Sequence, residues 1–316
     1  MYDRDRLLQS ELSRRALLKY SIAGLAGLAF GTQTLQTLQA AGVPQAPSSL
    51  RVGPPPPLFC IAYIDPDIPS HANQESLIAR YPLTLVPQDM RSTHVKWRDR
   101  IKHLNPKISM LGYQVVIEET TVPGPGHEVL RSVKDSWCTY PGGYQPTVRE
   151  PRNFRIYDPR KPEWQESFLA ACRATLQSYP YNGLFLDQCS VFEKAHPLSA
   201  VKAEMRQALQ VTLLRLRREF PGIILIGNSS YNWQGLNGEL NEGQPKKMLE
   251  ELAPFDGHAQ PTMDLYESIL KNPNDIETVR REMALAHSQG AYYSAAVDAQ
   301  HVLWFDAFDE VMTQYR

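Results

Sequence analysis

The sequence predicts an α/β fold in which parallel strands and helices alternate to form a (β/α)8 barrel of the TIM type. One arrangement recurs from residue 58 onward: a helix ends, proline or glycine follows, and a short apolar strand begins. Residues 58–316 also approach the typical length of such a barrel, ~250 residues. No Gly-x-Gly-x-x-Gly motif follows the first strand, which disfavours the alternative of a doubly wound, dinucleotide-binding sheet. Some units are expected to be irregular or incomplete.

Seven strands are predicted from short apolar runs bounded by proline, glycine or other turn residues. Continuous apolar runs suit strands that are buried on both faces, as in a parallel sheet. In chain order they are Leu58–Ile64, Leu83–Val86, Ile108–Val116, Leu184–Leu186, Ile223–Ile226, Phe255–Ala259 and Ala291–Val297. The eighth strand is ambiguous. It falls near Arg155–Tyr157 or within His301–Phe305, and the second segment also fits a helix.

Helices are predicted where apolar residues recur every three or four positions. Residues 162–178 and 198–219 show this stripe most clearly, with charged residues off the stripe. Asn274, with Glu277 after it, resembles the start of a further helix that Gly290 ends. The last helix is expected within Val302–Tyr315.

The N-terminal segment has the order of a cleaved export signal: basic, then apolar, then small residues. Leu12–Lys19 reads Leu-Ser-Arg-Arg-Ala-Leu-Leu-Lys and resembles the twin-arginine signal pattern. The apolar segment Ser21–Phe30 is shorter than the ~20 residues of a membrane span. Ala40 and Ala41 offer a cleavage site. The alternative is an uncleaved membrane anchor.

Three regions follow from this reading: a twin-arginine signal peptide at 1–41, a proline-rich linker at 42–57 and a single barrel domain at 58–316. The twin-arginine export machinery is then a partner, and the mature protein is expected to be periplasmic or secreted, without stable membrane insertion. The formal net charge of −1 and the lack of a basic stripe disfavour nucleic-acid binding. Cys138 and Cys189 are expected at the same rim, where an oxidising compartment would permit a disulfide.

Polar side chains collect where the predicted strands end, and in barrels these carboxyl ends form the active face. Asp187 ends the run Leu184–Leu186 abruptly. A buried charge needs a partner or a wet cleft, so Asp187 is the first candidate for chemistry, although capping a helix or pairing with an arginine fits the local sequence equally well. The other polar strand-end residues are Asp65, Asp67, Gln88, Asp89, Glu118, Glu119, Asn228, Glu239, Glu242, Gln260, Asp264 and Asp298.

Three motifs resemble those of exported, glycosidase-like barrel proteins of the glycoside hydrolase type. Residues 182–187, Asn-Gly-Leu-Phe-Leu-Asp, are similar to their D-G-[IVL]-F-[IVL]-D strand. Residues 223–228 and the following Gly-Glu-Leu-Asn-Glu-Gly at 238–243 resemble their I-x-N-G and G-x-x-x-E-G pair, and Lys102–Tyr113 resembles their third unit. Asn182 and Ser229 depart from the pattern, but neither removes a carboxylate.

The resemblance implies a glycoside hydrolase that acts on a polysaccharide or oligosaccharide with two carboxyl groups. Asp187 would be the nucleophile or base. Glu242, on a mobile loop, would be the general acid, kept protonated by aromatic neighbours such as Trp233 and Tyr231. Glu239 is the rival for the acid role. No cofactor or metal is expected.

Substrate binding is assigned to further residues near the same edge: Asp65, Tyr113, Glu118, Trp137, Asn228, Trp233 and Glu239. The long excursion 120–162 carries Trp137 and is expected to be a lid or an aromatic wall, with a simple insertion on the barrel rim as the alternative. Two other functions remain open. One is a barrel that binds glycans without cleaving them, and the other is a metal-dependent hydrolase that uses Asp65, Asp67 and a histidine.

Overall fold

The computed structural model describes residues 58–68, 74–120, 154–189, 199–228, 233–243, 257–297 and 301–313. The predicted signal peptide and linker lie outside these ranges, as do Trp137, Tyr231 and Asp298. In the described ranges, none of the helices combines the length and the apolar character that a bilayer crossing needs.

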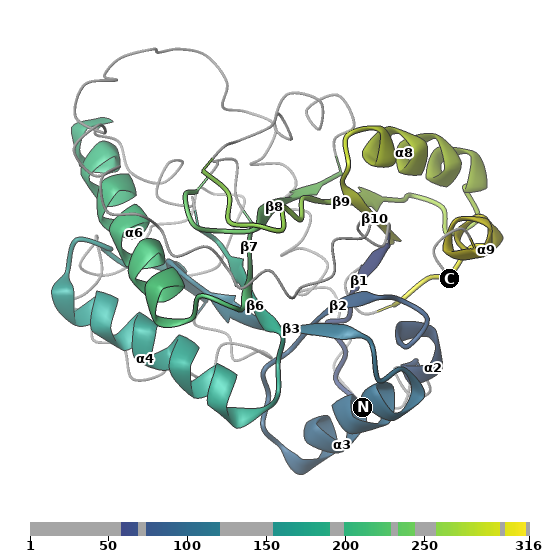
Figure 1. Cartoon of the computed structure of the whole chain (residues 1–316), viewed down its shortest axis with the longest axis horizontal. Coiled ribbons are helices and arrows are strands. Elements are labelled where there is room, and N and C mark those ends of the chain that lie inside the picture. The colour runs from purple at the N-terminus through teal and green to yellow at the C-terminus, as the bar shows by residue number, and fades with distance from the viewer. Residues whose placement is uncertain are drawn as a thin grey trace.

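Eight parallel strands form one sheet in the order β1-β2-β3-β6-β7-β8-β9-β10 (Figure 1). A parallel bridge between Leu58 and Tyr293 brings the last strand back beside the first, so the sheet curls into a barrel. The predicted fold class is therefore confirmed. The strands are β1 Phe59–Ile61, β2 Leu83–Val86, β3 Ser109–Val115, β6 Gly183–Asp187, β7 Ile224–Asn228, β8 Gly238–Glu242, β9 Leu265–Ile269 and β10 Tyr292–Ala296.

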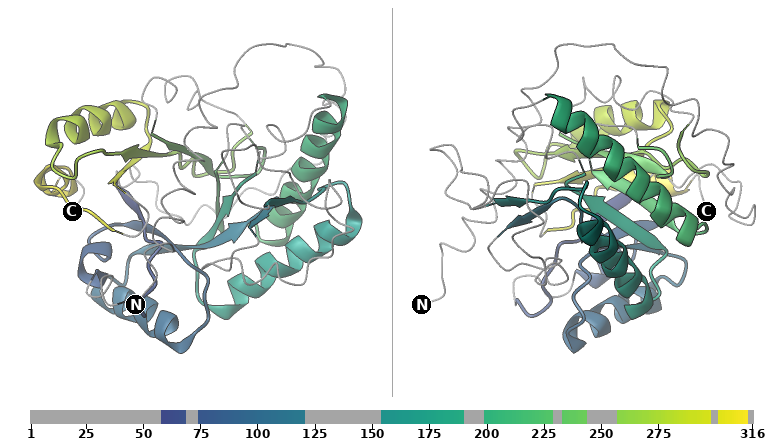
Figure 2. Two further views of the ribbon diagram at one scale, coloured as in Figure 1. Left: turned by 180° about the vertical axis from the view of Figure 1, so that it is seen from behind. Right: turned by 90° about the vertical axis from the view of Figure 1, so that its left-hand side faces the viewer.

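Helices lie on the outside of the barrel, as Figure 2 shows from two further sides. They are α2 Glu75–Ile78, α3 Ser92–Leu104, α4 Pro162–Ser178, α6 Ser199–Glu219, α8 Ile276–Ser288 and α9 Asp306–Thr313. The helix predicted at 162–178 is confirmed in full, and those predicted at 198–219 and before Gly290 are confirmed within one or two residues. The last helix begins only at Asp306, because residues 301–305 are neither helix nor strand.

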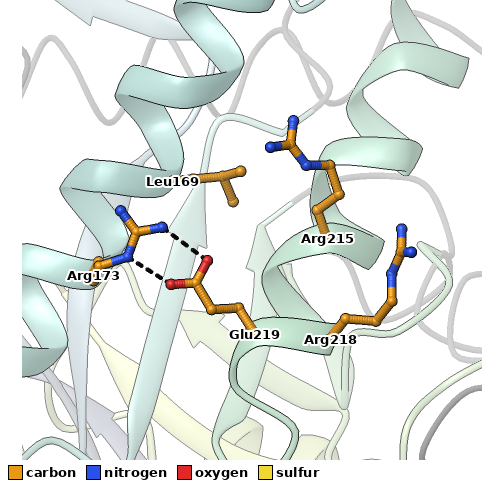
Figure 3. Close-up of a pocket in the computed structure, with 5 residues that line it drawn as sticks. All are labelled: Leu169, Arg173, Arg215, Arg218 and Glu219. Carbon is orange, nitrogen blue, oxygen red and sulfur yellow. Dashed lines mark hydrogen bonds and ion pairs between the residues drawn. The ribbon is translucent and has the colours of Figure 1, made fainter.

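Two ion pairs join α4 to α6 beside an open groove on the outer surface, and Figure 3 shows the first of them, between Arg173 and Glu219. The guanidinium of Arg173 donates to both carboxylate oxygens of Glu219, at 2.6 and 2.9 Å. Arg215 donates to Glu166 at 2.5 Å. These ion pairs hold α4 and α6 together. In the chain, the two helices precede and follow β6, the strand that ends at Asp187.

Two strands of the barrel differ from the prediction. The strand predicted at Phe255–Ala259 is wrong, because residues 257–260 form no strand. Two strands that were not predicted, β8 and β9, belong to the sheet instead. Their sequences, Gly-Glu-Leu-Asn-Glu and Leu-Tyr-Glu-Ser-Ile, contain two or three polar residues each and form no continuous apolar run. The search for continuous apolar runs therefore missed them.

Neither candidate for the eighth strand belongs to the barrel. Residues 154–156 form β5, which pairs antiparallel with β4 (Glu118–Thr120) in a separate two-stranded sheet. His301–Phe305 is not a strand. At the start of β6, Gly183 passes so close to β7 that a Cβ atom would lie 1.8 Å from the carbonyl oxygen of Ile224. Glycine in the Asn-Gly-Leu-Phe-Leu-Asp motif is thus needed for strand packing.

The connection between β7 and β8 contains no helix within its described residues. A buried arginine holds the part of this connection that leads into β8. Arg217 on α6 is only 2% exposed. Its guanidinium donates to the carbonyls of Gly235 at 2.7 Å and Ile223 at 2.6 Å, and to the Asn237 side chain at 2.6 Å. Burial lowers the pKa of Arg217 to about 10, a value at which the side chain stays charged at neutral pH.

We expect Arg217→Met to lower the free energy of unfolding by about 3 kcal/mol, because buried carbonyl groups would lose their donors. Thermal or urea unfolding measures the change. The matched control is Arg218→Met, since Arg218 is exposed and its guanidinium donates to the carbonyl of Leu214 at 3.3 Å. Equal stabilities for the two variants would contradict a structural role for Arg217.

Candidate active site

The strand register determines which side chains face the inside of the barrel, because paired residues on neighbouring parallel strands point to the same face. On β9, Tyr266 faces outward, where its hydroxyl donates to Glu282 of α8 at 3.0 Å. Glu267 therefore faces inward, and so does Glu242, which pairs with it. Glu239 is an odd number of residues from Glu242 and faces outward.

Asp187 and Asn228 lie on the same inner face as Glu242. Phe185 pairs with Ile226, and Asn228 pairs with Leu240, which is two residues before Glu242. The three polar residues thus end β6, β7 and β8, at the carboxyl edge of three adjacent strands. The sequence placed all three at this edge, and the structure brings them together.

Three hydrogen bonds hold the carboxylate of Asp187. The hydroxyl of Tyr113 donates to Oδ2 at 2.5 Å. The Oδ1 atom accepts from the side-chain amide of Asn228 at 2.9 Å and from the backbone N–H of Gln188 at 2.8 Å. Asp187 is only 8% exposed, so these donors replace most of its contact with water.

The same surroundings set the pKa of Asp187, which is raised to about 6. Burial is the largest cause, because it disfavours the charged carboxylate, and the negative charge of Glu242 adds to it. The hydrogen bonds from Tyr113, Gln188 and Asn228 act in the opposite direction. Asp187 is therefore ionised at neutral pH and becomes protonated in mild acid.

Glu242 is the last residue of β8, rather than part of the mobile loop that the sequence suggested. Its side chain is partly exposed. The following residue, Gly243, adopts a left-handed φ of 74° and donates its N–H to the carbonyl of Glu267 at 2.8 Å. Glu242 therefore lies on a fixed strand end, close enough for its charge to act on Asp187.

Glu239 has a different environment, on the outer face of β8. It is 4% exposed, and its Oε1 atom accepts from the backbone N–H of Trp233 at 3.2 Å. A Cβ atom on Gly227 of β7 would lie 2.7 Å from Glu239 Oε2, so the carboxylate covers that glycine. Trp233 is only 2% exposed and offers little ring surface for stacking on a sugar. The aromatic surroundings expected for Glu242 thus do not come from an exposed Trp233 ring.

Asp65 belongs to a second polar cluster, beyond the ends of β1 and β2. Arg91 lies at its centre and donates to Asp65 at 3.1 Å, to Asp67 at 2.8 Å and to Asp89 at 2.6 Å. The Nε2 atom of the fully buried His94 lies 2.6 Å from an Arg91 nitrogen, so it acts as the acceptor of a neutral ring. Burial is the main cause that lowers the pKa of His94.

Donor atoms of Asp65, Asp67 and His94 lie within 4.8 Å of one another, and this donor set suits a divalent cation. The guanidinium of Arg91 already supplies a positive charge at this point. A metal ion would have to compete with this guanidinium for Asp65 and Asp67.

The remaining predicted site residues are placed as follows. Tyr113 packs against Tyr63 with ring centroids 4.5 Å apart, in an edge-to-face contact. Glu118 begins β4, and its backbone pairs with Ile156, while its side chain lies outside the described part. Cys189 is a free, fully buried thiol, and Cys138, its possible disulfide partner, lies outside the described residues.

Two predicted edge residues lie elsewhere, and one inner carboxylate was missed. Gln260 and Asp264 precede β9, at the edge opposite to the active face, because the strand expected before them is not there. Glu267 is fully buried on the inner face beside Glu242. Tyr266 and Ile269, residue types that are common in strands, were the signal that could have identified this strand and, within it, Glu267.

The amino-acid sequence matches no protein-family model and no curated protein. Solved structures resemble it more clearly. The glycoside hydrolase domain of PelA from Pseudomonas aeruginosa is 16% identical with a TM-score of 0.56, over 79% of this chain and 97% of that chain. Ega3 from Aspergillus fumigatus, in complex with galactosamine, is 10% identical with a TM-score of 0.50, over 82% and 98%.

The α-galactosidase TtGalA from Thermus thermophilus, in complex with p-nitrophenyl α-D-galactopyranoside, is 15% identical with a TM-score of 0.52, over 83% of this chain and 62% of that chain. At these identities the likeness concerns the fold. The chain shares the barrel fold of these proteins, which include a glycoside hydrolase domain and an α-galactosidase.

Proposed function

We propose that this protein is a glycoside hydrolase that cleaves a polysaccharide or oligosaccharide with the carboxyl groups of Asp187 and Glu242. One observation carries the proposal: Asp187 and Glu242 are the last residues of β6 and β8, and the strand register places both on the inner face at the carboxyl edge of the barrel. Two carboxyl groups at one end of a barrel are what glycoside hydrolysis requires. The fold likeness to glycoside hydrolases supports the same function.

Asp187 suits the nucleophile or base, because Tyr113, Asn228 and the Gln188 N–H hold it in one orientation. Glu242, the other carboxyl group at this end of the barrel, is the proposed general acid and would act in its protonated form. It would protonate the glycosidic oxygen as the bond between that oxygen and the sugar carbon breaks, and water would supply the hydroxyl group of the new reducing end. A nucleophilic Asp187 requires carboxyl groups about 5 Å apart, whereas a base that activates water requires roughly 6.5–9.5 Å.

A screen for released reducing ends tests the proposal. The mature protein would be incubated with a panel of polysaccharides and oligosaccharides, including galactosamine- and galactose-containing ones, because two of the similar structures carry such ligands. Release by the wild type, absent from Asp187→Asn, is the expected result. Binding without release would favour a glycan-binding barrel. Activity lost with a chelator and restored by a divalent ion would favour the metal-dependent hydrolase with Asp65, Asp67 and His94.

The proposal includes export through the twin-arginine machinery, with the mature protein in the periplasm or outside the cell. Replacing Arg14 and Arg15 together with lysine is expected to leave a full-length precursor in the cytoplasm, since the paired arginines are the recognised feature of the signal. Cell fractionation with detection of the precursor measures this. The control is the same double substitution at Arg280 and Arg281, two adjacent exposed arginines on α8 outside the signal, which should leave export and cleavage unchanged. Normal export of the Arg14, Arg15 variant would point to another route.

A further inference from the structure

Gln188 adopts a backbone conformation that side-chain-bearing residues rarely adopt. Its φ is 63°, and it is the one non-glycine residue with a positive φ among those the structure describes. The left-handed region is unfavourable for most residues with a Cβ atom, and glycine, asparagine and aspartate adopt it most readily. Residues held in such conformations cluster at functional sites.

The conformation places Gln188 directly against the reaction centre. Its N–H donates to Oδ1 of Asp187 at 2.8 Å, and the N–H of Cys189 reaches the carbonyl of Asn228 at 3.4 Å. The chain thus turns back over the ends of β6 and β7. These are backbone contacts, and glycine would make them with less strain. The backbone alone does not explain a glutamine at this position.

The side chain of Gln188 is half-buried and makes no hydrogen bond or ion pair to any residue in the described ranges. Tyr113 and Asn228, the other neighbours of Asp187, both use their side chains to hold its carboxylate. A carboxamide offers two donors and one acceptor oxygen, which match the hydroxyl or amide groups of a sugar.

We propose that Gln188 is a specificity-determining residue, whose carboxamide hydrogen-bonds the sugar bound beside Asp187. This inference rests on the proposed function. The contact accounts for a strained residue next to Asp187 whose polar side chain bonds to no described residue, since a glycine would relieve the strain but lose the carboxamide.

The test compares wild type, Gln188→Gly and Gln188→Asn on a substrate found by the screen. Gln188→Gly keeps the turn and the N–H but removes the carboxamide. We expect its kcat/KM to fall about ten- to hundredfold, while its thermal midpoint stays equal or rises. Gln188→Asn tolerates the same φ and should restore part of the activity. The pH dependence of both variants should match the wild type, because the Asp187 hydrogen bonds remain.

A Gln188→Gly variant with wild-type kcat/KM would overturn the inference. So would a loss of activity that comes with a shifted pH profile, because the change would then act through Asp187. Binding of an oligosaccharide to Asp187→Asn, with and without Gln188→Gly, separates this inference from the proposed function. Tenfold weaker binding of the double variant in calorimetry supports the contact even if hydrolysis fails, and equal binding refutes it.

Discussion

Replacing Asp187 with asparagine is expected to lower glycosidase activity by several orders of magnitude, because a nucleophile or base supplies most of the transition-state stabilisation at its step. The change preserves shape. Asparagine Oδ1 can accept the hydrogen bonds from Asn228 and Gln188, and its amide can donate to the Tyr113 hydroxyl. The loss of activity would therefore be caused by the missing negative charge and not by a displacement of the end of β6. Initial rates on a screened substrate measure it.

The same variant should be more stable than the wild type at pH 8. The pKa of Asp187 is raised from 3.8 to about 6 in the folded protein, so the wild type loses stability as the pH rises from about 4 to about 6. Asparagine has no such dependence. Above pH 6 we expect Asp187→Asn to exceed the wild type by about 1 to 3 kcal/mol, with the difference vanishing near pH 4. Thermal unfolding at both pH values shows the effect.

Asp264→Asn is the matched control, because burial also raises the pKa of Asp264 to about 6. Asp264 precedes β9, at the opposite edge of the barrel, and its Oδ1 accepts from the Glu239 N–H at 3.1 Å. Its neutral variant should keep wild-type activity per folded molecule. If Asp187→Asn instead unfolds the protein while activity per folded molecule persists, Asp187 is a structural partner and the glycosidase proposal loses its main residue.

The order of strands and helices was predictable because most strands are apolar runs that end at proline or glycine. The strands that escaped detection, β8 and β9, have a buried outer face that is polar. Glu239 accepts from the Trp233 N–H there, and Tyr266 and Ser268 both donate to Glu282. From the sequence alone, polar residues on a buried face suggest a loop, because the hydrogen-bond partners that allow their burial are distant along the chain and cannot be identified.

The position of Asp187 and Glu242 at strand ends was predictable, but the hydrogen bonds around Asp187 were not. Tyr113 and Asn228 were predicted to bind substrate, and the structure shows in addition that both donate to Asp187. Their function depends on register: β3 and β7 flank β6, so residues far apart in sequence meet at one carboxylate. The spacing of residues within a sequence motif does not determine how parallel strands that are distant in the sequence align with each other.

Glu242 and Glu239 share one strand, and their glutamine variants are expected to behave differently. Glu242→Gln removes the proposed acid, so activity should fall strongly on natural glycans and least on substrates with good leaving groups, which need little protonation. On such an activated substrate, kcat/KM of the wild type should decline below about pH 6, where Asp187 takes up a proton.

Glu239→Gln is the matched control for this experiment, since it makes the same chemical change three residues away on the outer face of β8. Glutamine Oε1 can still accept from the Trp233 N–H, so we expect nearly wild-type activity and an unchanged decline below pH 6. Loss of activity in Glu239→Gln, with an active Glu242→Gln, would transfer the acid role to Glu239. That outcome would also contradict the face assignment, because an outward, 4% exposed carboxylate cannot reach a sugar bound at the barrel mouth without a change in β8 register.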